Sequence, residues 1–208
     1  MRLVVITDDT HRLELMEQSK DLPPGVQFID SIESLPSAEV YLDLLFDYTD
    51  ARIRKLQHAA TRAVILNAVS IDPAQLPTGI ARINGWPGFL KSEQVEGTCK
   101  EVAVKKISDD ALALFGKSIR WEADQPGFIA ARIVSQIINE AFYVLGEELS
   151  SGSEIDTAMK LGTNHPFGPI EWSKMIGLDA IYRLLVLLAQ TEKRYEPAPL
   201  MRKIMEGK

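Results

Sequence analysis

The chain changes character at a Pro-Gly break, D-Q-P-G, at residues 124–127. Before this break, short apolar runs typical of buried strands alternate with short helical segments. After it, the run from Phe128 to Leu145 is apolar around most of the circumference of a helix, and only other helices can cover such a surface. We therefore predict an α/β domain over residues 1–122, followed by an all-helical domain over residues 123–208.

The alternation in the first part predicts a parallel, Rossmann-like sheet of reduced size. Strands are expected over residues 2–7, 26–29, 39–46, 63–66, 80–83 and 118–121, and helices over 10–20, 49–60 and 98–115. Thr98 and Glu101 have the spacing of a capping box at the start of the last of these helices. In the second part, helices are expected over 128–145, 153–162, 169–175 and 179–192, with Ser153 and Asp156 capping the second.

Composition excludes several classes of protein. The net charge of −6, with no compensating stripe of Lys and Arg, argues against a nucleic-acid partner. Cys99 is the single cysteine, so a disulfide framework or a cysteine metal site within the chain is excluded, and no metal is expected. The longest purely apolar run, at 184–189, is too short to span a bilayer. We expect a cytoplasmic protein that does not bind membranes.

Three stretches carry a family resemblance. They are G-K at 116–117 with D-Q-P-G-F-I-A-A-R-I at 124–133, E-I-D-T-A-M-K-L-G-T-N-H-P-F-G-P-I-E-W at 154–172, and I-G-L-D at 176–179. The chain resembles the 3-hydroxyacyl-CoA dehydrogenase family, whose motifs are D-x-P-G-F-I-x-N-R, I-D-x-A-M-x-x-G-x-x-x-P-M-G-P-x-E and V-G-L-D. The resemblance is strongest over residues 116–208.

The resemblance implies a dinucleotide-binding domain and a helical domain like the C-terminal domain of 6-phosphogluconate dehydrogenase. The helical domain would form most of a homodimer interface. The implied reaction, in fatty acid metabolism, is oxidation of a 3-hydroxyacyl-CoA by NAD. In that family a histidine oriented by a glutamate is the general base, and a serine and an asparagine hold the substrate oxygen.

This sequence differs from the family at the catalytic positions. The family glutamate is kept as Glu96, but Asn84, twelve residues earlier, stands at the position of the histidine. Asparagine forms hydrogen bonds but does not titrate near neutral pH. Val69 stands at the position of the serine, with Ser70 beside it as a candidate replacement, and Ala131 stands at the position of the asparagine.

The cofactor-binding positions also differ. The first strand is followed by T-D-D-T-H at residues 7–11, without the glycines of G-x-G-x-x-G, and the two carboxylates would repel a phosphate. Asp30, after the second strand, lies roughly where an acid would bind a ribose. We therefore expect no bound cofactor.

Two functions remain open. The first is a non-catalytic homodimer, a binding or structural relic of the fold with acyl-CoA as a candidate ligand. The alternative is an active 3-hydroxyacyl-CoA dehydrogenase, or a related acyl-CoA enzyme, with rearranged residues such as Ser70, Glu96 or His165; NAD would be the cofactor of such a dehydrogenase.

Overall fold

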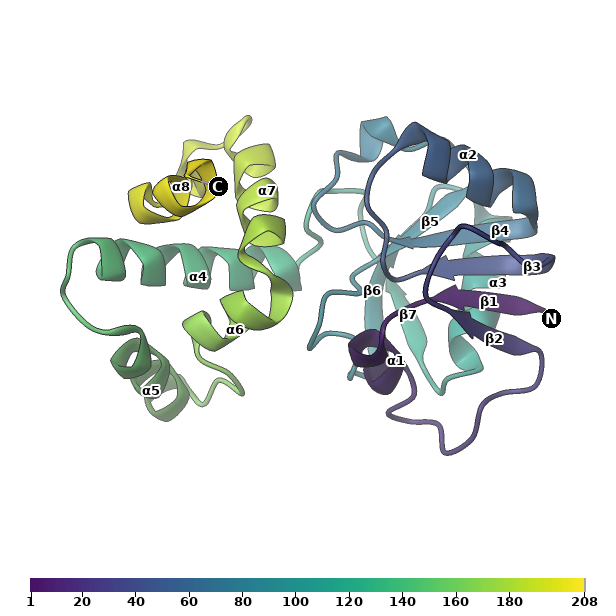
Figure 1. The fold of residues 1–208 in the computed structure, drawn as a ribbon, viewed down its shortest axis with the longest axis horizontal. Coiled ribbons are helices and arrows are strands. Elements are labelled where there is room, and N and C mark those ends of the chain that lie inside the picture. Colours follow the sequence, from purple (N-terminus) through teal and green to yellow (C-terminus); the bar gives the residue numbers. More distant parts are fainter. Residues whose placement is uncertain (208) are drawn as a thin grey trace. The chain divides into compact units, whose positions relative to one another are not determined.

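The computed structural model describes residues 1–207 and divides into two compact units (Figure 1). The first unit is Met1–Phe128, and the second begins at Ile129. The sequence placed the boundary a few residues earlier, after residue 122. The D-Q-P-G break at 124–127 thus lies at the end of the first unit.

The first unit contains a seven-stranded sheet in the order β2-β1-β3-β4-β5-β6-β7. Neighbouring strands are parallel except β5 and β6, which are antiparallel, so the predicted Rossmann-like sheet is confirmed. The strands are β1 (Leu3–Ile6), β2 (Val26–Ile29), β3 (Ala38–Asp43), β4 (Ala60–Asn67), β5 (Ile80–Ile83), β6 (Gln94–Thr98) and β7 (Ser118–Trp121).

Both faces of this sheet are buried. Leu3 and Val5 of β1 belong to one hydrophobic cluster, while Val4 and Ile6 belong to another, as the alternation of side chains along a strand requires. Helices α1 (Asp9–Leu15) and α3 (Val102–Ala113) contribute to the first cluster, and α2 (Asp50–Ala59) contributes to the second. A short 3-10 helix, η1 (Pro73–Gln75), precedes β5. Burial on both faces explains why the strands are continuous apolar runs.

The predicted end of α1 is wrong. The helix ends at Leu15 rather than Lys20, and Leu13, an apolar residue of this segment, is 72% exposed. The inward-facing side chains are His11, Glu14 and Leu15. Glu14 can be buried because both of its carboxylate oxygens accept a hydrogen bond from the backbone N–H of Gly88.

The expected capping box at Thr98 is also wrong. Thr98 ends β6, opposite Arg82 of β5, and α3 begins only at Val102 with Glu101 as its N-cap. Strand β6 was not predicted because Glu and Gly are both uncommon in strands. Gly97 is required there by close packing, since a Cβ atom would lie 2.5 Å from Cγ2 of Ile119 on β7.

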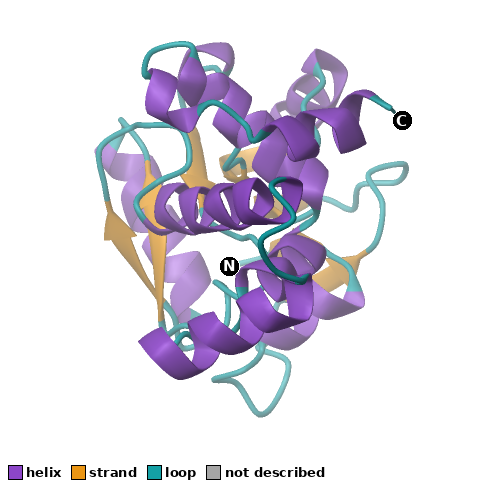
Figure 2. Cartoon of the chain, turned by 90° about the vertical axis from the view of Figure 1, so that its left-hand side faces the viewer, coloured by secondary structure: helices purple, strands orange, loops and turns teal. Residues whose placement is uncertain are grey.

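In the second unit, all regular structure within the described residues is helical (Figure 2). Helix α4 (Ala130–Gly146) buries Val134, Ile138 and Phe142 and packs against α6, α7 and α8. The predicted helical domain is confirmed, although its last part, from residue 193, was not anticipated. The other elements are α5 (Gly152–Thr163), α6 (Pro169–Ile176), α7 (Leu178–Ala189), η2 (Lys193–Tyr195) and α8 (Pro199–Glu206).

The start of α5 differs from the prediction by two residues. Ser151 and Glu154, rather than Ser153 and Asp156, form the capping box. Asp156 is instead buried, and its Oδ1 accepts a hydrogen bond of 2.7 Å from the backbone N–H of Ile170. This bond joins α5 to the first turn of α6, where Pro169 occupies the expected first position. No helix among residues 1–207 has the length and apolar character needed to cross a membrane.

We predict that Gly97→Ala lowers the free energy of unfolding by about 1–3 kcal/mol, because the new methyl group overlaps Ile119. Gly162→Ala is the matched control. No atom lies within 4 Å of a Cβ at this helical position, so it should leave stability unchanged or raise it by about 0.5–1 kcal/mol. Urea denaturation of both variants measures the difference. Equal effects would contradict the close packing of β6 against β7.

Candidate active site

The antiparallel pairing of β5 and β6 brings Asn84 and Glu96 together. Asn84 directly follows β5, and its backbone N–H donates to the carbonyl oxygen of Glu96 at 2.9 Å. Its side-chain Nδ2 donates to Oε2 of Glu96 at 3.1 Å. Both residues are buried, Asn84 to 1% and Glu96 to 8% exposure. The structure therefore places these two sequence-predicted residues in direct contact.

A second donor reaches Glu96 from the next strand. Arg120 lies opposite Glu96 in the parallel pairing of β6 with β7, and its Nη2 is 3.1 Å from Oε1 of Glu96. The same guanidinium bonds Glu122 through Nε at 2.5 Å. Each carboxylate oxygen of Glu96 thus accepts a hydrogen bond, which fixes the orientation of the group.

The amide oxygen of Asn84 is buried without a hydrogen-bond partner among the described residues. An unsatisfied buried acceptor costs about 1–3 kcal/mol, and such atoms are uncommon in folded proteins. The pair therefore combines an anchored carboxylate with an unused acceptor. The carboxylate can take a proton, and the amide oxygen can accept a hydrogen bond from a hydroxyl.

A third polar residue, Asn67, supports the loop that begins with Asn84. Its Oδ1 accepts a hydrogen bond of 3.0 Å from the backbone N–H of Gly85, and its Nδ2 donates to the carbonyl of Leu44. A Cβ at position 85 would lie 2.9 Å from Cγ of Asn67, so only glycine fits there. Asn67 was not among the residues predicted from the sequence; its place at the carboxyl end of a predicted strand was the available signal.

The remaining sequence-predicted residues lie on other segments of the chain. Val69 is buried and Ser70 is half-buried, both in the segment that follows β4. Ala131 lies fully buried on α4 of the second unit. His165 lies half-buried in the turn between α5 and α6. Asn84 and Glu96 are joined by a side-chain hydrogen bond within the first unit.

The carboxyl ends of β1 and β2 border a hollow of about 440 Å³. Asp30, which follows β2, lies on its rim and fits a ribose hydroxyl by its acceptor chemistry. Asp8 is the N-cap of α1, and its Oδ1 accepts a 2.8 Å hydrogen bond from the backbone N–H of His11. The Asp8 carboxylate therefore occupies the start of α1, where a pyrophosphate would need free backbone N–H groups. The residues present do not fit the pyrophosphate of NAD.

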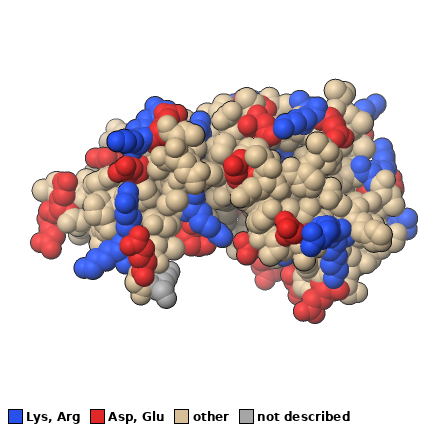
Figure 3. All heavy atoms as spheres, turned by 90° about the horizontal axis from the view of Figure 1, so that it is seen from above, with Lys and Arg blue, Asp and Glu red and all other residues tan. Residues whose placement is uncertain are grey.

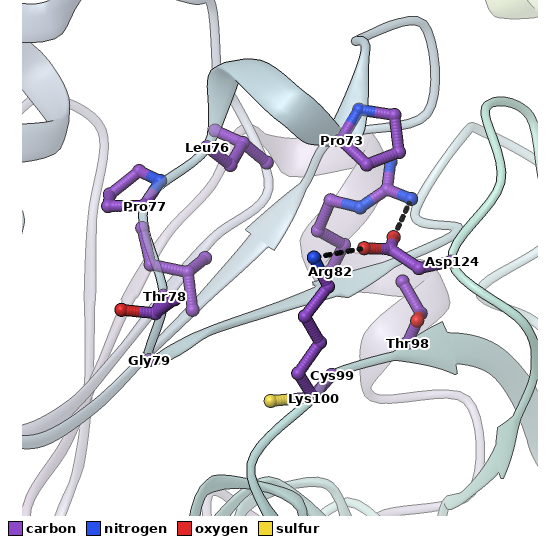
Figure 4. A pocket seen from close by; sticks show the side chains of 11 residues that line it. Pro73, Leu76, Pro77, Thr78, Gly79, Arg82, Thr98, Cys99, Lys100 and Asp124 are labelled. Atoms are coloured by element: carbon purple, nitrogen blue, oxygen red, sulfur yellow. Dashed lines mark hydrogen bonds and ion pairs between the residues drawn. The ribbon is translucent and has the colours of Figure 1, made fainter.

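A smaller cavity of about 40 Å³ lies near η1 and the start of β5 (Figure 4). Arg82 is buried at its edge, donating from Nη2 to Asp124 at 2.6 Å and from Nη1 to the carbonyl of Ala68. Lys100 approaches the other oxygen of Asp124 at 4.0 Å. The volume suits a water molecule rather than a substrate. This ion pair anchors the D-Q-P-G segment to the sheet.

Among residues 1–207, no group of three or more His, Cys, Asp or Glu side chains is placed to hold a metal ion. Acidic and basic side chains are interspersed on the face drawn in Figure 3.

The comparisons with known proteins agree with this architecture. Residues 127–208 match the family model of the 3-hydroxyacyl-CoA dehydrogenase C-terminal domain. A 3-hydroxybutyryl-CoA dehydrogenase of Bradyrhizobium diazoefficiens is 35% identical over 142 residues, which cover 67% of this chain and 48% of the relative. The 3-hydroxyadipyl-CoA dehydrogenase of Escherichia coli K12 is 44% identical over 89 residues, which cover 42% of this chain and 19% of the relative.

Two solved structures are similar over nearly the whole chain. The (S)-3-hydroxybutyryl-CoA dehydrogenase PaaH1 from Ralstonia eutropha has a TM-score of 0.68 at 26% identity, covering 88% of this chain and 70% of that one. FadB2 of Mycobacterium tuberculosis has a TM-score of 0.73 at 15% identity, covering 99% of this chain and 94% of that one. The second likeness concerns the fold alone.

The fold and the matched segment define a protein with a Rossmann-like first unit and a helical second unit. The chain belongs to the 3-hydroxyacyl-CoA dehydrogenase family. It spans about half the length of the first curated relatives that match it over most of the chain.

We predict that Asn84→Asp destabilises the protein by about 3 kcal/mol near pH 7, because it buries a second carboxylate beside Glu96. Burial and repulsion would raise the folded-state pKa of the new acid above its unfolded value of about 3.9. The variant should therefore match the unchanged protein near pH 4 and lose stability as the pH rises. Urea denaturation at both pH values, with the exposed Asn164→Asp as control, measures this. A difference in stability that does not change with pH would contradict the contact between Asn84 and Glu96.

Proposed function

We propose that the chain acts on a 3-hydroxyacyl-CoA or 3-oxoacyl-CoA thioester, as an enzyme of its family with a rearranged catalytic set. The names of the relatives support the substrate class, since they are dehydrogenases of 3-hydroxybutyryl-CoA and 3-hydroxyadipyl-CoA. The single observation that carries the proposal is the buried Glu96 carboxylate, held by Asn84 and Arg120 beside an unused amide oxygen.

In this proposal Glu96 transfers the proton itself. Asn84 has no titratable proton, so the carboxylate is the only group of the pair able to act as an acid or base. The Asn84 side chain would position Glu96 through Nδ2 and accept a substrate hydroxyl at Oδ1. In the family the histidine takes the proton and the glutamate orients the histidine. Here Glu96 would take the proton and Asn84 would orient Glu96.

A proton acceptor serves two reactions of a 3-hydroxyacyl-CoA. In oxidation, the hydroxyl proton goes to the base and a hydride leaves C3 for an acceptor, which in the family is NAD. In dehydration, the carboxylate takes a proton from C2, the C2=C3 double bond forms, and the hydroxyl leaves C3 with that proton as water, so no cofactor is required. The residues near Asp8 do not fit the pyrophosphate of NAD. Proton transfer from the substrate to Glu96 is therefore the one step proposed for this chain.

We predict that Glu96→Gln, which keeps the shape of the side chain, lowers turnover of 3-hydroxybutyryl-CoA by about 10²- to 10⁴-fold. Mass spectrometry of the thioesters, with and without NAD, identifies oxidation and dehydration separately. Glu122→Gln is the matched control, because Glu122 also pairs with Arg120 and the change likewise removes one carboxylate. Turnover that is unchanged in Glu96→Gln would exclude Glu96 as the proton-transferring group.

A second candidate is a non-catalytic homodimer that retains the fold, with an acyl-CoA as candidate ligand. Two observations favour it: no histidine accompanies Glu96, and the start of α1 is occupied by a carboxylate. The proposed dimer surface is on the helical unit, where Ile129 and Ile133 are 48% and 56% exposed. Absence of turnover by the unchanged protein in the assay above would favour this candidate.

We predict a dimer of twice 23.2 kDa in sedimentation at micromolar concentration. Ile133→Glu should shift it to the monomer by placing a charge in the proposed apolar contact. Leu13→Glu is the matched control, since Leu13 is 72% exposed but lies on α1 of the first unit. A monomer before any substitution would rule out the homodimer.

A further inference from the structure

The connection between β1 and α1 is short and of ordinary backbone conformation. Only Thr7 and Asp8 separate the two elements, and neither has a positive φ. A dinucleotide's pyrophosphate needs glycines that let the backbone approach closely, followed by free N–H groups at a helix start. This connection supplies no glycine between β1 and α1.

The helix start is already satisfied from within the chain. Oδ1 of Asp8 accepts the backbone N–H of His11 at 2.8 Å and lies 2.7 Å from Nδ1 of the same residue. Burial acts to raise the pKa of Asp8, but hydrogen bonds from the backbone and ring of His11 outweigh it, so the pKa is lowered overall. Asp8 is therefore ionised at neutral pH.

The surrounding charges add to the effect of Asp8. Asp9 follows it in the first turn of α1, and Asp30 lies across the hollow at the end of β2. The cation on this lining is Arg12, whose guanidinium stacks over the ring of Phe28 at 4.7 Å. Three carboxylates against one guanidinium give the hollow a negative balance, which opposes an anionic ligand.

We infer that the start of α1 excludes the pyrophosphate of NAD, because the Asp8 carboxylate takes the position and the hydrogen bonds that a phosphate would need. The chain thus keeps the Rossmann-like sheet, but the connection between β1 and α1 does not bind a dinucleotide. This inference concerns the hollow beside β1 and β2 and does not depend on the proposed role of Glu96.

Isothermal titration of the full chain with NAD and NADH tests the inference. The 3-hydroxybutyryl-CoA dehydrogenase of Bradyrhizobium diazoefficiens serves as the reference protein. We expect no saturable heat up to about 1 mM of either nucleotide, the upper end of usual enzyme affinities. Saturable binding by the unchanged chain below that concentration would overturn the inference. Thioester titrations in the same instrument report on the proposed function separately.

The double variant Asp8→Asn/Asp9→Asn identifies the cause. Asparagine still caps a helix, so the variant removes two charges while keeping α1, and circular dichroism checks that it is folded. NAD binding that appears only in the variant supports exclusion by charge. Binding by neither protein also supports exclusion, with the missing glycines as the cause. Equal binding by both proteins would overturn the inference.

Discussion

The antiparallel pairing of β6 with β5 is the constraint on which the candidate site depends. It reverses the direction of an otherwise parallel sheet and so places Glu96 opposite the residue that follows β5. Gly97 allows β6 to pack closely against β7, because a Cβ atom there would lie 2.5 Å from Cγ2 of Ile119. The Asn84–Glu96 contact is therefore a consequence of sheet topology and close packing rather than of a flexible loop.

Around this contact, each neighbouring strand contributes a supporting interaction. Arg120 of β7 holds the second oxygen of Glu96, and Asn67 at the end of β4 fixes Gly85 next to Asn84. Buried hydrogen-bond networks of this kind are rigid when they are complete. Among the described residues of this network, the Asn84 amide oxygen lacks a partner, which is why we propose that this atom binds a ligand.

Much of the fold could be predicted because both faces of the sheet and the inward face of α4 are apolar. Strand β6 could not be predicted, because Glu96 and Gly97 are held in the strand by contacts with residues distant in sequence, which a local pattern does not show. Asn84 and Glu96 were singled out by the family resemblance, which implies a contact between the residues at these two positions. Asn67 was missed because its role depends on Gly85, a residue far from it in sequence.

We propose that Asn84 and Glu96 form the ligand-contacting site of the first unit. Nuclear magnetic resonance of ¹⁵N-labelled protein tests it most directly, through the side-chain amide of Asn84 and the backbone amide of Gly85. Titration with 3-hydroxybutyryl-CoA should move both signals along one saturable curve, because the ligand hydroxyl bonds the free amide oxygen. Saturable shifts elsewhere in the spectrum, with these two signals unmoved, would contradict the claim.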